Sequence, residues 1–241
     1  MSEPETPPPG ETRKSESDIR RAVLEAALPR LAEDGFTDKT LNFAAAAANV
    51  DAGTLARVFP RGPQDLVSAF SEWADQQMDA ALAATPLSDM KIRERIKAAV
   101  NARIVALRPY KEAARRAAAF LSMPQNTPLA AELLWRTADR MWRAAGDSST
   151  DFNFYTKRAI LMGVYSSTLL RWFTDTSADE KDTFDFLDAR IENVMQFEKF
   201  KAEVNEQLSK LPSLTELLKG FRPQDAAHEP PSPPRGERDT G

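Results

Sequence analysis

Few side chains in this sequence have the types and spacing that catalysis or metal binding requires. Its 241 residues include no cysteine and a single histidine, His228, in a Pro-rich stretch. Thiolate chemistry is therefore absent, and a histidine-based metal site or catalytic base is nearly excluded. Asp147, Asp151 and Asn153 carry oxygen ligands, but their spacing lacks the alternating acids and distal Glu of a calcium loop. We predict no catalytic residue and no metal site, and interpret these polar side chains as helix caps.

Composition and charge narrow the class of protein further. The net charge of −4 provides no general attraction for nucleic acid or anionic lipid. Residues 159–170 form the longest apolar run, but hydroxyl residues interrupt it and it is too short for a membrane span. Helix-forming residues are abundant and no strand-like alternation occurs, so we expect an all-α protein.

The most apolar helix is expected to follow the polar loop 146–151, with Thr150 or Asp151 as its N-cap. Apolar residues occupy two of its faces, which indicates burial on more than one side. The adjacent Phe154 and Tyr155 point about 100° apart around such a helix. We therefore expect the helix to be central to the body, and we do not expect Phe154 and Tyr155 to face the same core.

A turn at 50–53 separates two expected helices, 41–48 and 54–59, and Thr40 is the expected cap of the first. The layout of residues 35–66 is similar to the N-terminal domain of the tetracycline-repressor family. That resemblance implies a repressor-like helical bundle with a helix-turn-helix unit. In that family the unit binds DNA, and the following helices bind small molecules.

The charge of this unit argues against DNA binding. Between residues 37 and 59, two acidic side chains balance two basic ones: Asp38, Asp51, Lys39 and Arg57. A DNA-binding unit must neutralise several phosphates and present cations or amides to base edges. We predict that this unit is not used for DNA.

A second resemblance starts at the polar loop. Residues 145–158 read Ala-Gly-Asp-Ser-Ser-Thr-Asp-Phe-Asn-Phe-Tyr-Thr-Lys-Arg, and residues 186–191 read Phe-Leu-Asp-Ala-Arg-Ile. Both segments resemble the family of the ninth coenzyme Q biosynthesis protein, and the likeness extends over roughly residues 17–200. Many members carry Trp where this chain has Phe154. The phenyl ring of Phe154 keeps the stacking area of the Trp ring but lacks the indole N–H.

This resemblance implies a non-enzymatic, lipid-binding accessory protein of ubiquinone biosynthesis. Such a protein binds isoprenoid quinone intermediates, or a phospholipid, at the membrane and presents the intermediates to the di-iron demethoxyubiquinone hydroxylase. The resemblance also implies a homodimer, and we expect no cofactor beyond the bound lipid. The first ten residues do not resemble a signal peptide, so we expect a cytoplasmic protein peripheral to the inner membrane of a bacterium. A ligand-responsive transcription regulator of the tetracycline-repressor type is the alternative, and an enzyme is the weakest hypothesis.

We expect five segments in the chain. They are a disordered tail (1–16), the helix-turn-helix-like unit (17–70), a helical lipid-binding body (71–196), an amphipathic segment (197–221) and a disordered Pro-rich tail (222–241).

Three groups of residues are candidates for function. The candidate lipid-binding residues, for which core packing remains the alternative, are Trp135, Trp142, Met162, Tyr165, Leu169, Trp172 and Met195. The candidate contacts for the hydroxylase, which follow from the resemblance, are Met141, Asp151, Phe154 and Tyr155. The candidate membrane contacts lie on the apolar side of the amphipathic segment and are Phe200, Val204, Leu208, Leu211, Leu214, Leu217, Leu218 and Phe221. Packing of this segment on the body or on a second subunit remains its alternative.

Overall fold

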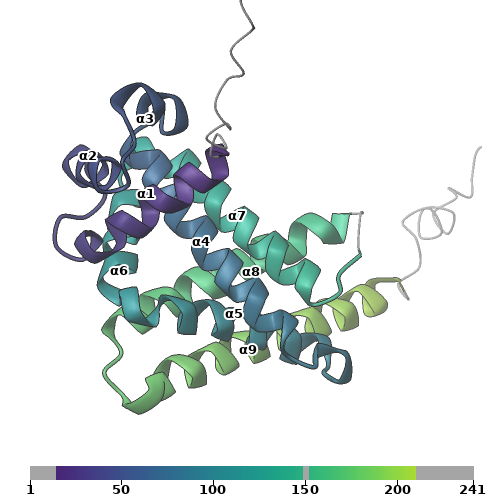
Figure 1. The fold of residues 1–241 in the computed structure, drawn as a ribbon. Coiled ribbons are helices and arrows are strands. Elements are labelled where there is room, and N and C mark those ends of the chain that lie inside the picture. Colours follow the sequence, from purple (N-terminus) through teal and green to yellow (C-terminus); the bar gives the residue numbers. More distant parts are fainter. Residues whose placement is uncertain (1–14, 149–151, 210–241) are drawn as a thin grey trace, which may run out of the picture. The chain divides into compact units, whose positions relative to one another are not determined.

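The computed structural model describes residues 15–148 and 152–209, and these residues form helices without any strand (Figure 1). The α-helices are α1 (Glu16–Leu31), α2 (Asp38–Ala47), α3 (Ala52–Val58), α4 (Pro63–Ala83), α5 (Ile92–Leu107), α6 (Lys111–Leu121), α7 (Thr127–Ala144), α8 (Phe152–Thr174) and α9 (Lys181–Ser209). Short 3-10 helices are η1 (Leu87–Asp89), η2 (Arg108–Tyr110), η3 (Pro124–Asn126) and η4 (Ala178–Glu180). The expected all-α class is confirmed.

Side-chain caps start the first three helices. The hydroxyl of Ser15 accepts a hydrogen bond from the backbone N–H of Asp18, and the carboxylate of Asp51 accepts one from the N–H of Thr54. In α2 the cap is Thr37, whose hydroxyl accepts from the N–H of Thr40 at 3.2 Å. The prediction of Thr40 as the cap is therefore wrong. Thr37 has the extended backbone that an N-cap requires, whereas Thr40 already lies in the first helical turn.

The helix-turn-helix-like unit is not a separate domain. Helices α1, α2 and α3 lie together at one end of α4, and α1 packs against both α2 and α4 (Figure 1). Gly62 has a positive φ of 58° and Pro63 occupies the first turn of α4, a combination that starts this helix abruptly. The expected boundary between residues 70 and 71 lies inside α4, where Leu66 and Phe70 are buried.

The remaining helices form a body around α4. Helix α4 packs against α5 and α7, α7 packs against α8, and α6 contacts both α7 and α8. Buried Met78, Ile104, Met141 and Trp172 come from four different helices of this body. A continuous core of this kind holds each helix in a fixed rotation about its own axis.

The chain divides into two compact units, residues 1–194 and 195–241. Helix α9 continues across both this division and the expected boundary at 196/197. The side chains expected at the membrane lie outside the part that the structure describes: three belong to the last turns of α9, and the other five follow it. Within the described residues, no helix is both long and apolar enough to cross a membrane.

Candidate functional site

Helices α4 to α8 enclose a cavity of about 260 Å³ with an apolar lining. Its apolar walls include Phe70, Leu107, Leu121, Leu133, Leu169 and Phe173. The lining residues that are exposed are Ser122, after α6, and Leu170, on α8, so the cavity opens between these two helices. Such a space suits an apolar ligand and lies near the lower end of the range for ligand pockets, about 300–1,000 Å³.

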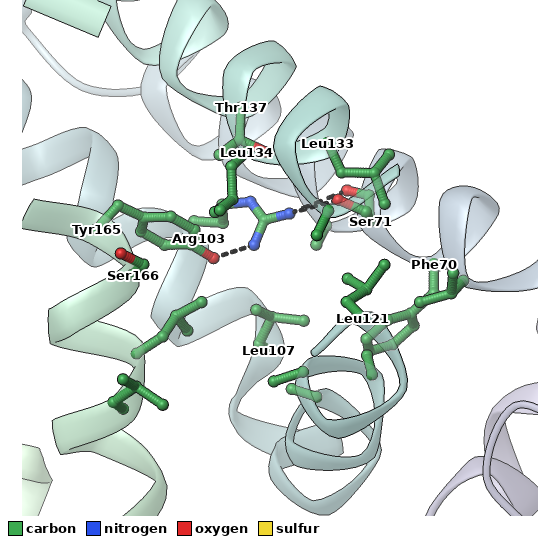
Figure 2. Close-up of a pocket in the computed structure, with 18 of the residues that line it drawn as sticks. Phe70, Ser71, Arg103, Leu107, Leu121, Leu133, Leu134, Thr137, Tyr165 and Ser166 are labelled. Atoms are coloured by element: carbon green, nitrogen blue, oxygen red, sulfur yellow. Dashed lines mark hydrogen bonds between the residues drawn. The ribbon is translucent and has the colours of Figure 1, made fainter. Parts of the chain in front are cut away.

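One wall of this cavity is polar. The Arg103 guanidinium donates through Nε to Asp75 Oδ1 at 2.7 Å, and through its other nitrogens to the hydroxyls of Tyr165 and Ser71. Thr137 Oγ1 donates to the same Asp75 carboxylate at 2.9 Å. Figure 2 shows Arg103 between Tyr165 and Ser71, with Leu107, Leu121 and Phe70 around the open space. The Arg103–Asp75 pair is buried, and the positive charge of Arg103 lies next to the negative charge of Asp75.

This environment keeps Tyr165 protonated. Burial raises the pKa of its phenol, Arg103 lowers it and the nearby Asp75 charge raises it, and together these effects raise the pKa to about 12. The phenol is therefore neutral at any physiological pH. The whole polar wall, made of Arg103, Asp75 and uncharged hydroxyls, carries no net charge.

Sequence analysis did not find the Arg103–Asp75 pair. Arg103 lies on the stripe that also carries Ile96, Val100 and Leu107, all of which are buried. A cation in the apolar stripe of a helix is a usable signal, because buried charges are nearly always paired. Its partner stands 28 residues earlier on α4, and no sequence spacing identifies it.

Two of the seven predicted lipid-binding residues, Tyr165 and Leu169, line this cavity. Both belong to the α8 stripe 165, 166, 169, 170 and 173, which follows the helical period. Trp172 is on a neighbouring face of α8 and is completely buried, so it packs in the core.

Three more of the predicted lipid-binding residues, Met162, Trp142 and Trp135, also lie away from the cavity lining. Met162 is half-buried against the core, and Trp142 is half-buried with its indole N–H donating to the Lys157 carbonyl at 3.0 Å. Trp135 belongs to the aromatic cluster described next. The side chain of Met195 lies outside the described part of the chain.

A second feature is the aromatic cluster formed by Trp135, Phe154 and Tyr155. The Trp135 ring stacks on Tyr155 with centroids 5.9 Å apart and lies 6.0 Å from Phe154. The two α8 rings meet edge to face at 5.1 Å. Tyr155 is 61% exposed. The cluster therefore places a joined aromatic surface over α7 and the start of α8.

A buried cation supports this cluster from below. Arg158 is 1% exposed, and its guanidinium carbon lies 3.4 Å from the centroid of the Phe154 ring. Arg158 donates to Asp139 at 2.7 Å and to Asp147 at 3.1 Å, and Lys157 pairs with Asp147 at 2.7 Å. These ion pairs hold the first turns of α8 against α7 and the preceding loop. The burial of Arg158 and its two carboxylate partners were not predicted from the sequence.

The remaining predicted partner contacts are Met141 and Asp151. Met141 is completely buried on α7, so its assignment as a surface contact is corrected: it is a core residue. Its helix face turns toward α4 and α8, where periodicity alone cannot tell a core position from an interface position. Asp151 lies outside the described residues.

Comparisons with known proteins agree with both resemblances. The profile of the COQ9 family matches residues 127–198. The chain is 33% identical over 192 residues to the mitochondrial ubiquinone biosynthesis protein COQ9 of Rattus norvegicus, covering 77% of this chain and 61% of that protein. For the Homo sapiens protein of the same name the identity is 31%, with coverage of 77% and 60%. The expected family resemblance is confirmed.

Among solved structures, the chain is similar to a TetR transcriptional regulator from Nitrosomonas europaea. The TM-score is 0.57 at 20% identity, and the match covers 72% of this chain and 96% of the regulator. At that identity the similarity concerns the fold, which confirms the expected repressor-like bundle.

The relatives also correct the expected location. They are named as mitochondrial proteins of eukaryotes, including rat, human and Drosophila melanogaster. The prediction of a cytoplasmic protein at a bacterial inner membrane is therefore contradicted. It rested on the amino-terminal residues, and this chain spans only about three-fifths of the length of the rat and human relatives.

Proposed function

We propose that this chain, a member of the COQ9 family, is a non-enzymatic accessory protein of ubiquinone biosynthesis that binds isoprenoid quinone intermediates and presents them to the demethoxyubiquinone hydroxylase. The observation that carries the proposal is the apolar cavity of about 260 Å³ that opens between α6 and α8. Each buried CH₂ group contributes about 0.8 kcal/mol to staying in an apolar phase. A polyprenyl intermediate therefore needs a protein cavity to leave the bilayer at a useful rate.

The aromatic cluster supports the presenting role. An exposed tyrosine stacked on tryptophan is typical of an interface anchor. Helix α8 carries both Tyr155 of this cluster and, further along, Tyr165 and Leu169 of the cavity wall. A partner bound at the start of α8 thus contacts the same rigid element that lines the ligand space. We also propose that residues 197–221 provide a reversible membrane contact.

The test is mass spectrometry of lipids that co-purify with the protein, compared between wild type and a cavity-filling variant. Ala118 is a half-buried residue of the cavity wall, whereas its neighbour Ala119 is exposed and does not line the cavity. We expect isoprenoid lipids on the wild type, loss of most of them in Ala118→Phe, and retention in Ala119→Phe. A wild-type protein that carries no lipid, or equal lipid content in both variants, contradicts the proposal.

A further inference from the structure

The hydroxyl groups around the cavity differ in what their own hydrogens bind. Thr137 donates to Asp75, Ser166 donates to the Gly163 carbonyl at 3.3 Å, and Ser122 donates to the Ala119 carbonyl at 2.8 Å. Tyr165 and Ser71 instead accept from Arg103. Among the described residues, neither of these two hydroxyls has an acceptor for its own hydrogen. A hydroxyl has one donor hydrogen, and a guanidinium offers no acceptor, so both hydrogens remain available for a ligand.

Arg103 fixes this arrangement. Its Nη2 also donates to the Ser71 carbonyl at 3.2 Å, and Asp75 accepts from Nε. The guanidinium thereby donates to the oxygen of both hydroxyls, Tyr165 and Ser71. Each hydroxyl then has its own hydrogen left to donate. A hydroxyl that accepts from a cation is also a stronger donor, because hydrogen bonds in a chain polarise one another.

The charge of the wall limits the ligand further. Arg103 is the only charged residue among those that line the cavity, and Asp75 neutralises it. Anionic groups such as phosphate are bound by unpaired cations, usually in bidentate geometry. A neutral acceptor such as a carbonyl, in contrast, matches two hydroxyl donors on a wall without net charge.

We infer that the cavity holds the headgroup end of its ligand, and that Tyr165 and Ser71 select a neutral, oxygen-accepting headgroup of the quinone type over an anionic lipid headgroup. This inference rests on the proposed lipid-binding function and adds a specificity to it. The apolar tail then leaves through the side of the cavity where Leu170 is 65% exposed. An alternative arrangement, in which only the tail enters, would leave both donor hydrogens unpaired in an apolar space.

The test uses the full chain and competition against a fluorescent apolar dye. The probes are a dimethoxy-methyl-benzoquinone with a two-isoprene tail and the matching hydrocarbon without the quinone ring. One neutral hydrogen bond changes affinity by about three- to tenfold. We expect Tyr165→Phe and Ser71→Ala each to weaken quinone binding by this factor and to leave hydrocarbon binding unchanged. The matched control Ser167→Ala removes a half-buried hydroxyl of the same helix that does not line the cavity and whose hydrogen already bonds to the Val164 carbonyl at 2.9 Å, so both affinities stay at the wild-type value.

Two measurements on the wild type do not depend on the folding of any variant. The carbonyl stretch of the bound quinone probe should move to lower frequency than in an apolar solvent. A monoacylglycerol should bind more tightly than the lysophosphatidic acid with the same chain.

The outcomes separate the inference from the function. Any one of three results overturns the inference and leaves lipid binding itself standing. These are equal losses of affinity for the quinone and the hydrocarbon, an unshifted carbonyl stretch, and tighter binding of the anionic lipid. Failure of every probe to displace the dye from the wild type overturns both.

Discussion

Buried arginines stand beside both candidate sites of this protein, and they differ in the groups to which they donate. Arg158, below the aromatic cluster, is paired with the carboxylates of Asp139 and Asp147 and covered by the Phe154 ring. Arg103, in the cavity wall, has one carboxylate and two hydroxyl partners. Arg158 donates to two carboxylates and to the Phe154 carbonyl, none of which can donate in turn. Arg103 donates to two hydroxyls, and each of these hydroxyls has a hydrogen of its own to donate.

The largest expected effect is a loss of stability when Arg103 no longer has the Asp75 carboxylate as its partner. Asp75→Leu places an unpaired guanidinium in the core, which costs about 3–5 kcal/mol of unfolding free energy. The control is Asp79→Leu, four residues later, whose carboxylate is half exposed and pairs with Arg140 at 3.1 Å. An exposed pair of that kind contributes about 0–1 kcal/mol. Urea unfolding measures both, and a loss below about 1 kcal/mol for Asp75→Leu would show that the cavity arginine does not depend on its pair.

A substitution in the exposed part of the aromatic cluster should weaken binding to the hydroxylase rather than lower stability. Tyr155→Ala removes an exposed ring, so we expect thermal unfolding close to wild type and about thirtyfold weaker binding to the hydroxylase, or about 2 kcal/mol. Phe43→Ala is the control, because Phe43 is also an exposed aromatic residue but lies on α2. Surface binding assays with the purified hydroxylase measure the difference, and unchanged affinity in Tyr155→Ala would remove the cluster from the interface.

Phe154 is a less selective probe than its neighbour. Its ring lies between Trp135 and the Arg158 guanidinium, so Phe154→Lys brings an ammonium group next to a buried cation. We expect this variant to lose both hydroxylase binding and thermal stability, in contrast with Tyr155→Ala. A Phe154→Lys protein with the wild-type melting temperature would show that the ion pairs of Arg158 do not depend on the Phe154 ring.

Another buried charge is Asp175, after α8, and no cation pairs with its carboxylate among the described residues. Its carboxylate accepts from the hydroxyl and backbone N–H groups of Ser177 and Thr183. Burial raises the pKa of Asp175, but these hydrogen bonds outweigh it and hold the pKa well below its usual range. Because the folded-state pKa is depressed, the stabilisation is present above about pH 4 and is lost as the pH falls toward the folded value.

Asp175→Ala should therefore cost about 1–2 kcal/mol at pH 7, as expected for a helix cap. The difference from wild type should shrink below pH 4. Urea unfolding at several pH values checks this, and Asp89→Ala, an exposed acid in η1, is the control. A difference that grows on acidification would have the wrong sign for a depressed pKa.

The smallest expected effect concerns the exposed cations near α2 and α3. Arg57 pairs with Glu16 at 3.4 Å and Lys39 with Asp34 at 3.2 Å, which leaves little charge for phosphate. We expect at most weak retention of DNA in low-salt gel shifts, and no change with Arg57→Ala. A nanomolar complex whose affinity falls steeply with salt would instead favour the regulator hypothesis.

The sequence by itself determined the class of fold and the family resemblance. Helical periodicity located the long helices, and the order of turn and capping residues between 35 and 66 indicated the repressor-like start. The family resemblance led to Phe154 and Tyr155, and helical geometry added that two adjacent large aromatics are hard to bury in one core. These features depend on residues close together in the chain, for which local geometry is sufficient.

Only the tertiary structure decided which apolar residues surround a cavity. Tyr165 and Trp172 are both apolar positions of α8, yet one lines the cavity and the other is core. The rotation of α8 against α6 and α7 makes this difference, and periodicity within one helix does not contain it. The burial of Met141 follows from the same packing.

The pairing of Arg103 with Asp75 also required the packed body. Its two charges come from different helices, and their attraction becomes strong only where neighbouring helices exclude water. The same holds for Trp135, which joins Phe154 and Tyr155 across the contact between α7 and α8. A sequence specifies which side chains are available on each helix face, whereas the approach of one helix to another decides which of them meet.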